Sequence, residues 1–200
     1  MPELLDVFPC PVGIFQERVP TTNELDFIKS LEQGPNLANR RSLNTQVLDA
    51  DELFELSSII QDRVNMYFDT VYNTRAAHLR LTQSWCNYSE AGEGHHQHSH
   101  PNSSISGVYY PQAEAIDRLT FHTPLRPHQH LQVTPEKYNK YNSQVVDVEV
   151  KSGTLVLFPS YLEHSVDIVD DRKDTRISLS FNTFWVGSLG INEELTGLEL

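Results

Sequence analysis

The sequence predicts an α+β protein that is mainly β, with two helices near the N-terminus followed by seven or eight short strands. An apolar periodicity of three and four residues over 51–72 is typical of an amphipathic helix. From residue 79 onward, apolar and polar residues alternate, which is the period of a half-buried strand. Helices segregated from strands indicate α+β, and many strands with irregular connections favour a barrel or a two-sheet jelly roll.

The N-terminal part is expected to support this sheet. Residues 5–20 are predicted to be an extended edge strand, because Pro9 and Pro11 exclude a helix. Thr21 and Glu24 have the spacing of a capping box, which predicts a short helix that ends near residue 33, before a Gly-Pro pair.

The second helix follows a polar segment. Residues 36–50 are predicted to be a loop. The helix over 51–72 is then expected to be capped by Asp49 or Asp51.

The strands follow in the second half of the chain. The alternation predicts them at 79–87, 105–110, 118–122, 144–150, 154–158, 164–169 and 175–185. The segment 123–143, which contains His128, His130, Tyr138 and Tyr141, is predicted to be a loop. This loop either covers the mouth of the sheet as a lid or packs against its edge.

Length and composition predict one domain and exclude several classes of function. The 200 residues are expected to divide into an N-terminal strand and helices at 1–78, a core at 79–186 and a tail at 187–200. A net charge of −12 argues against binding of nucleic acid or anionic membranes, and no apolar run approaches the about 20 residues of a membrane span. Two distant cysteines and no signal peptide indicate the cytoplasm. The sequence does not decide between a monomer and a homodimer.

Histidine is the residue type that points to chemistry. His95, His96, His98 and His100 lie within six positions. In an extended strand residues i and i+2 face the same side, so His98 and His100 form a pair of metal ligands, with His96 as a competitor. His164, which follows an apolar strand ended by Pro159, is the best candidate for the third ligand.

Arg176 is the second candidate site residue. It shares a strand face with Ser178 and Ser180, while the alternate residues are apolar. A buried guanidinium is costly unless it meets an anion, and its fork suits a carboxylate. The partner is either a ligand or an acidic side chain of the protein.

These motifs together resemble the iron(II)/2-oxoglutarate-dependent oxygenases. The resemblance covers about residues 80–186 and is greatest to a poorly characterised group of oxygenases from phages and marine bacteria. Prolyl hydroxylases are more distantly similar. It rests on His98-x-His100, Gly107-Val-Tyr-Tyr110, Gly153-Thr-Leu-Val-Leu-Phe-Pro-Ser, His164 and Arg176-x-Ser178.

The resemblance implies a double-stranded β-helix, or jelly roll, with the two N-terminal helices as supporting elements. It implies Fe(II), 2-oxoglutarate and O2 as cofactor and cosubstrates, and a small-molecule, peptide or protein substrate, with hydroxylation of a peptidyl proline as the family-level expectation. His98 and His164 match the histidine ligands, and His100 stands at the third ligand position. Residues matched to the cosubstrate site are Arg176, Ser178, Tyr110 and Tyr88, with Asn87 and Asn182 as secondary polar contacts.

The chain departs from the family pattern at His100, where Asp or Glu is usual. Either three histidines bind the metal, or Glu90, Glu93 or another carboxylate completes the site, or the metal differs. One alternative is a cupin-type three-histidine protein that does not use 2-oxoglutarate; another is a nonenzymatic jelly-roll assembly protein.

Overall fold

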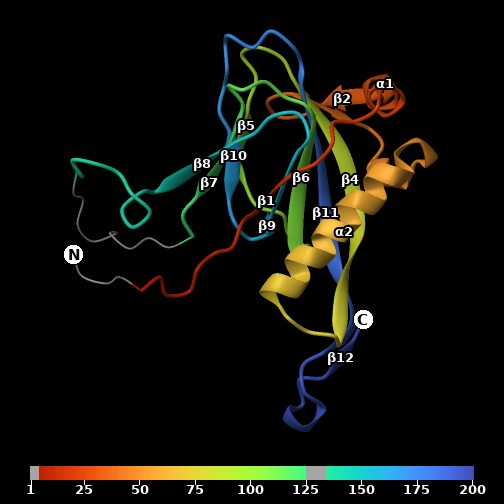
Figure 1. The fold of residues 1–200 in the computed structure, drawn as a ribbon, viewed down its shortest axis with the longest axis vertical. Coiled ribbons are helices and arrows are strands. Elements are labelled where there is room, and N and C mark those ends of the chain that lie inside the picture. Colours follow the sequence, from red (N-terminus) through yellow and green to blue (C-terminus); the bar gives the residue numbers. More distant parts are fainter. Residues whose placement is uncertain (1–4, 125–133) are drawn as a thin grey trace.

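The computed structural model describes residues 5–124 and 134–200. Two helices and two antiparallel sheets make up the fold (Figure 1). The main elements are β1 (Gly13–Gln16), α1 (Thr22–Ser30), β2 (Gln33–Pro35), β3 (Arg40–Ser42), α2 (Phe54–Val71), β4 (Ala77–Ser89), β5 (His95–His98), β6 (Ile105–Gln112), β7 (Arg118–His122), β8 (Val145–Glu149), β9 (Thr154–Pro159), β10 (His164–Val166), β11 (Arg176–Leu189) and β12 (Leu198–Glu199). Short 3-10 turns lie at Val47–Asp49, Asp51–Leu53 and Asn192–Glu194.

The two sheets form the double-stranded β-helix that the sequence predicts. The larger sheet has the order β1-β9-β6-β11-β4-β3-β2, with β12 attached to β11, and the smaller has the order β5-β10-β7-β8. The helix α2 lies across β4 and β11 in Figure 1 and covers the outer face of the larger sheet. Among the described residues, no helix is both long enough and apolar enough to cross a membrane.

Alternation along the strands builds two apolar cores. Tyr109 and Leu155 pack toward the helices, whereas their neighbours Tyr110 and Val156 pack between the two sheets. The helix-side core needs a glycine at position 107, because a Cβ there would overlap the Phe181 ring. At Arg176, Ser178 and Ser180 of β11 the inner face of the larger sheet is polar instead.

The N-terminal predictions are partly confirmed. The capping box of Thr21 and Glu24 is present, and β1 is an edge strand that pairs with β9 alone. The predicted strand over 5–20 is too long, since only Gly13–Gln16 is paired. The helix ends at Ser30 rather than near residue 33.

The polar segment before α2 is more ordered than predicted. The prediction of a loop over 36–50 is wrong for residues 40–42. These residues form β3, which pairs with β2 as a hairpin and with β4 on its other side. The predicted caps Asp49 and Asp51 are also wrong: α2 begins at Phe54, after a 3-10 turn, without a side-chain cap. The polar composition of β3 gives no sign of a strand, because its position is set by its pairing with β4.

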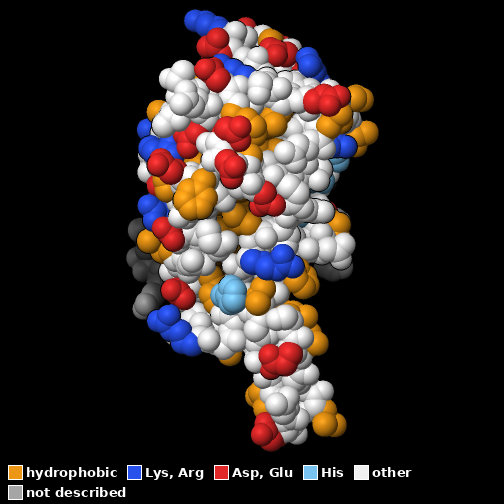
Figure 2. All heavy atoms as spheres, turned by 90° about the vertical axis from the view of Figure 1, so that its right-hand side faces the viewer, with side chains coloured by type: hydrophobic (Ala, Val, Ile, Leu, Met, Phe, Trp, Pro, Cys, Tyr) orange, Lys and Arg blue, Asp and Glu red, His pale blue; other side chains and the backbone are white. Residues whose placement is uncertain are grey.

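The C-terminal part forms an arm. Strand β11 continues to Leu189, and its last residues pair with β12. The hairpin of β11 and β12 projects from the body of the protein (Figures 1 and 2). Acidic and basic side chains are interspersed on the face shown in Figure 2. The lid prediction for 123–143 falls partly on residues 125–133, including His128 and His130, which lie outside the described residues. Tyr138 and Tyr141 are exposed and do not line the cavity described below.

Candidate metal and cosubstrate site

Three histidines from three segments of the chain lie close together. His98 ends β5, His164 begins β10, and the register of these strands places the two opposite each other. His100 follows on the connection to β6. One nitrogen of each ring lies within 4.8 Å of the others, and the Nε2 atoms of His100 and His164 are 3.3 Å apart.

Hydrogen bonds at Nδ1 fix the tautomer of each ring. The Nδ1–H of His98 donates to the His96 carbonyl (2.8 Å), and that of His164 donates to the Leu162 carbonyl (3.1 Å). His100 donates to Asn182 Oδ1 (2.9 Å). Since these oxygens can only accept, each Nδ1 carries the proton and each Nε2 keeps a free lone pair. This is the form in which imidazole binds a metal.

The amide of Asn182 is itself held in one orientation. Its Oδ1 also accepts from the Ser106 hydroxyl (2.9 Å), and its Nδ2 donates to Gln83 Oε1 (3.4 Å). Asn182 therefore positions the His100 ring, a role the sequence suggested only as a secondary polar contact.

Burial favours the neutral form of the three imidazoles. It lowers the pKa of His164 to about 3 and that of His100 to about 4, and it lowers the pKa of His98, with neighbouring imidazoles adding to the effect for His164 and His100. Neutral rings leave two unprotonated nitrogens facing each other at 3.3 Å, which is repulsive unless a cation lies between them. The site therefore fits a metal ion.

A second histidine cluster shares one member with the first. His95, His96 and His98 also bring ring nitrogens within 4.8 Å of one another, but His96 is exposed. Neither cluster, within the chain that is described, includes a carboxylate. Glu90 instead accepts from the Thr175 hydroxyl, and Glu93 accepts from the backbone N–H of Glu90.

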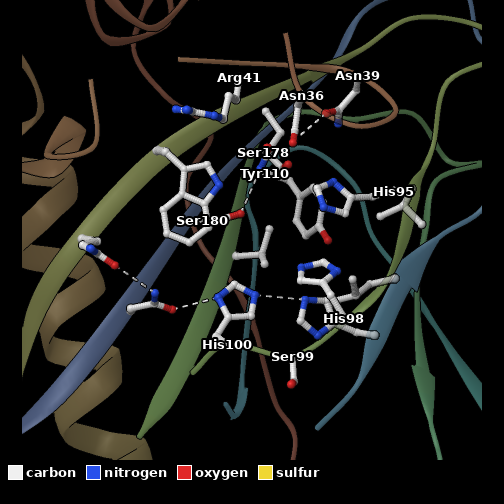
Figure 3. A pocket seen from close by; sticks show the side chains of 18 of the residues that line it. Asn36, Asn39, Arg41, His95, His98, Ser99, His100, Tyr110, Ser178 and Ser180 are labelled. Carbon is white, nitrogen blue, oxygen red and sulfur yellow. Dashed lines mark hydrogen bonds between the residues drawn. The ribbon is translucent and has the colours of Figure 1, made fainter. Parts of the chain in front are cut away.

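A cavity of about 450 Å³ leads from the three histidines into the space between the sheets (Figure 3). Arg176, at the start of β11, lies along its wall with Ser178 and Ser180 on the same face. Arg176 is 3% exposed; its Nη2 donates to the Tyr110 hydroxyl (3.3 Å), and its guanidinium lies 5.0 Å from the centre of the Tyr110 ring.

Arg176 belongs to a buried group of charged side chains whose net charge is positive. Asp117 Oδ1 accepts from Arg172 Nη2 at 2.6 Å and lies 3.8 Å from Arg176 Nε, which has no hydrogen-bond partner among the described residues. No second carboxylate of the described chain reaches either guanidinium within 4.0 Å. Two buried cations share one anion, so an anionic ligand at Arg176 would balance the charge.

The predicted residues thus separate into two sets. Those that line the cavity are His98, His100, His164, Arg176, Ser178, Tyr110, Asn87 and Asn182. Tyr88 is not among them, because it alternates with Asn87 and points to the helix side, where its hydroxyl donates to the Ile28 carbonyl (2.6 Å). Its expected contact with the cosubstrate is wrong.

Some cavity residues were not identified from the sequence. Trp85 and Arg41 line the cavity, and Asp117 and Arg172 form the charged group behind it. The alternation of side chains along a strand could have identified Trp85, since it shares a strand face with Asn87. The other three depend on a hairpin and on loop positions with no periodicity.

Known protein structures with the same fold are numerous. HygX from Streptomyces hygroscopicus with nickel and 2-oxoglutarate bound has a TM-score of 0.60 at 12% identity, over 87% of this chain and 82% of that one. A Pseudomonas putida prolyl-4-hydroxylase has a TM-score of 0.52 at 13% identity, over 86% and 92%. A 2OG-Fe(II) oxygenase family oxidoreductase from Burkholderia pseudomallei has a TM-score of 0.56 at 14% identity, over 79% and 74%. At this identity they show the fold.

The sequence itself decides the family. No curated protein matches the chain. A family model described as "Putative 2OG-Fe(II) oxygenase" matches residues 83–182, half of the chain, and this span contains all three clustered histidines and Arg176. The cupin-type and assembly-protein alternatives are therefore set aside, and the chain belongs to the 2OG-Fe(II) oxygenase family.

Proposed function

We propose that His98, His100 and His164 hold Fe(II) through their Nε2 atoms in this oxygenase. The observation that carries the assignment is the 3.3 Å distance between the Nε2 atoms of His100 and His164, whose Nδ1 atoms each lie within hydrogen-bond distance of an oxygen that can only accept. Three neutral ligands replace the usual two histidines and one carboxylate, so the protein contributes no negative charge to the metal.

Arg176 is proposed to bind the distal carboxylate of 2-oxoglutarate. Its Nε has no hydrogen-bond partner among the described residues, and the buried group of Arg172, Asp117 and Arg176 has a net charge of +1. Tyr110 and Ser178 flank the same end of the cavity and complete the carboxylate site.

The iron, O2 and 2-oxoglutarate supply the oxidising chemistry that side chains lack. The residues of the chain bind and orient these groups. Asn182 fixes the ring of His100, and Asp117 holds Arg172 close to Arg176 without neutralising both. The apolar walls formed by Val108, Leu119 and Val166 reduce the access of water.

The primary substrate is a small molecule or a peptide, and the proposed reaction is hydroxylation. Both cysteines are free thiols, in keeping with the cytoplasmic location that we propose.

The Arg176→Leu variant tests the cosubstrate site. Loss of a charge-assisted contact worth about 1.5–3 kcal/mol should weaken 2-oxoglutarate binding by about ten- to a hundredfold, while metal binding is unchanged. Isothermal titration of the Ni(II)-loaded protein with 2-oxoglutarate measures this directly. Tyr110→Phe should show a smaller loss.

Arg80→Leu is the matched control, because Arg80 is an exposed arginine of the same sheet. It should bind 2-oxoglutarate like the wild type. If the wild type and Arg176→Leu bind 2-oxoglutarate with equal affinity, the cosubstrate does not bind at Arg176.

A further inference from the structure

A second guanidinium, that of Arg41, lines the cavity. Six arginines of the described chain are at least partly buried, and Arg41 is the one that has no carboxylate within 4.0 Å. Its Nη1 donates to the Ser42 carbonyl at 3.0 Å. In Figure 3 Arg41 lies toward the end of the view opposite His100 and Ser99. A half-buried cation without a counter-charge favours an anionic ligand.

Directly opposite Arg41 in the register of β3 and β4 stands Asn87. Asn87 is 6% exposed and lines the cavity; its Nδ2 donates to the Ser180 hydroxyl (3.2 Å). Its Oδ1 is buried and has no donor among the described residues. A buried acceptor without a donor favours a ligand that carries an N–H or O–H group.

The two groups are close enough to hold adjacent parts of one small molecule. Side chains directly opposite each other on paired strands have Cβ atoms about 4.5–5.5 Å apart. An α-amino acid carries a carboxylate and an ammonium group on the same carbon. This matches a guanidinium that has no carboxylate partner in the described chain, beside a carbonyl oxygen that has no donor there.

This pair is separate from the proposed cosubstrate anchor. Arg176 lies opposite Ser89, whereas Arg41 lies opposite Asn87, which in turn faces Ser178. Two strand spacings of about 4.8 Å and two residues of about 3.4 Å put the two arginine Cα atoms about 12 Å apart. The two arginines therefore start from different strands and from different levels along the sheet.

The wall between this pair and the metal site is aromatic. Trp85 shares the inner face of β4 with Asn87, and its ring stacks on His100 with centroids 5.7 Å apart and an interplanar angle of 24°. A substrate side chain that extends from Arg41 and Asn87 along Trp85 would therefore point toward His100.

We propose that Arg41 and Asn87 bind the primary substrate and that this substrate is a free α-amino acid. Its carboxylate pairs with Arg41, and its ammonium donates to Asn87 Oδ1, so that its side chain faces the metal. The inference rests on the proposed function of the same cavity. It replaces the peptidyl substrate expected from the family, because a residue inside a peptide has neither a free carboxylate nor a free amine.

The test titrates the Ni(II)- and 2-oxoglutarate-loaded protein, without oxygen, with each of the free protein L-amino acids, using tryptophan fluorescence and calorimetry. At least one is expected to bind. Its methyl ester and its des-amino analogue should each bind about tenfold or more weakly, since each loses one charged contact.

Variants assign each contact to its residue. Arg41→Met should weaken binding of the amino acid and leave that of the methyl ester unchanged. Asn87→Leu should weaken binding of the amino acid and leave that of the des-amino analogue unchanged. Arg40→Met, which changes the exposed neighbour on β3, is the matched control and should behave like the wild type.

The outcomes separate this inference from the proposed function. If 2-oxoglutarate binds but no free amino acid does, the amino-acid site is refuted and the oxygenase assignment stands. If a blocked peptide binds and Arg41→Met does not weaken it, the substrate is peptidyl and the inference is also refuted. Failure of 2-oxoglutarate itself to bind counts against the proposed function.

Discussion

Replacing His164 by alanine should abolish stoichiometric metal binding. His164 supplies one of the three ligands. The loss of metal affinity should therefore exceed the loss of about 10–100-fold that is typical when only a hydrogen-bond partner of a ligand is removed. The side chain is 4% exposed and its ring lies 4.7 Å from that of Phe158, so the variant also leaves a small cavity, at a cost of about 1–3 kcal/mol in the free energy of unfolding. Iron content after equilibrium dialysis, with a thermal melt of the apo-protein, separates metal loss from unfolding.

His96→Ala is the matched control for His164→Ala. His96 is exposed and belongs to the second cluster alone, so its variant should retain the metal. Loss of metal in His96→Ala together with retention in His100→Ala would move the site to His95, His96 and His98.

Changing His100 to aspartate should preserve the metal site, whereas changing it to alanine should destroy it. Asp at this position restores the two-histidine, one-carboxylate set of ligands and adds one negative charge. Asn182 Oδ1 loses the His100 donor but keeps the Ser106 hydroxyl, so it is not left unpaired. We expect His100→Asp to retain or raise the conversion of 2-oxoglutarate to succinate without primary substrate, and His100→Ala to lose most of it.

Iron content and succinate release, measured side by side in the two variants, decide the role of His100. If the alanine variant binds iron as well as the wild type and the aspartate variant gains nothing, then His100 is not a ligand. The measurement requires no knowledge of the primary substrate.

Periodicity in the sequence predicts the strands that matter most for the site. The alternation over β11 correctly places Arg176, Ser178 and Ser180 on the inner face and Ile177, Leu179 and Phe181 in the core. The same rule, applied to β4, would have placed Tyr88 on the face opposite Asn87; the family resemblance suggested otherwise and was wrong.

Other features depend on contacts between distant segments. The β2–β3 hairpin has the polar composition of a loop, and it forms a strand because β4 offers it an edge. Asp117 and Arg172 lie 55 residues apart in loops with no repeating pattern, so their ion pair cannot be inferred from spacing. Arg41 and Asn87 meet for the same reason, through register.

A crystal structure of the protein with Mn(II) and an unreactive analogue of 2-oxoglutarate tests the central claim most directly. We predict one anomalous peak bonded to Nε2 of His98, His100 and His164, with the distal carboxylate of the analogue on the guanidinium of Arg176. A peak held by His95, His96 and His98, or an analogue bound away from Arg176, would contradict this account.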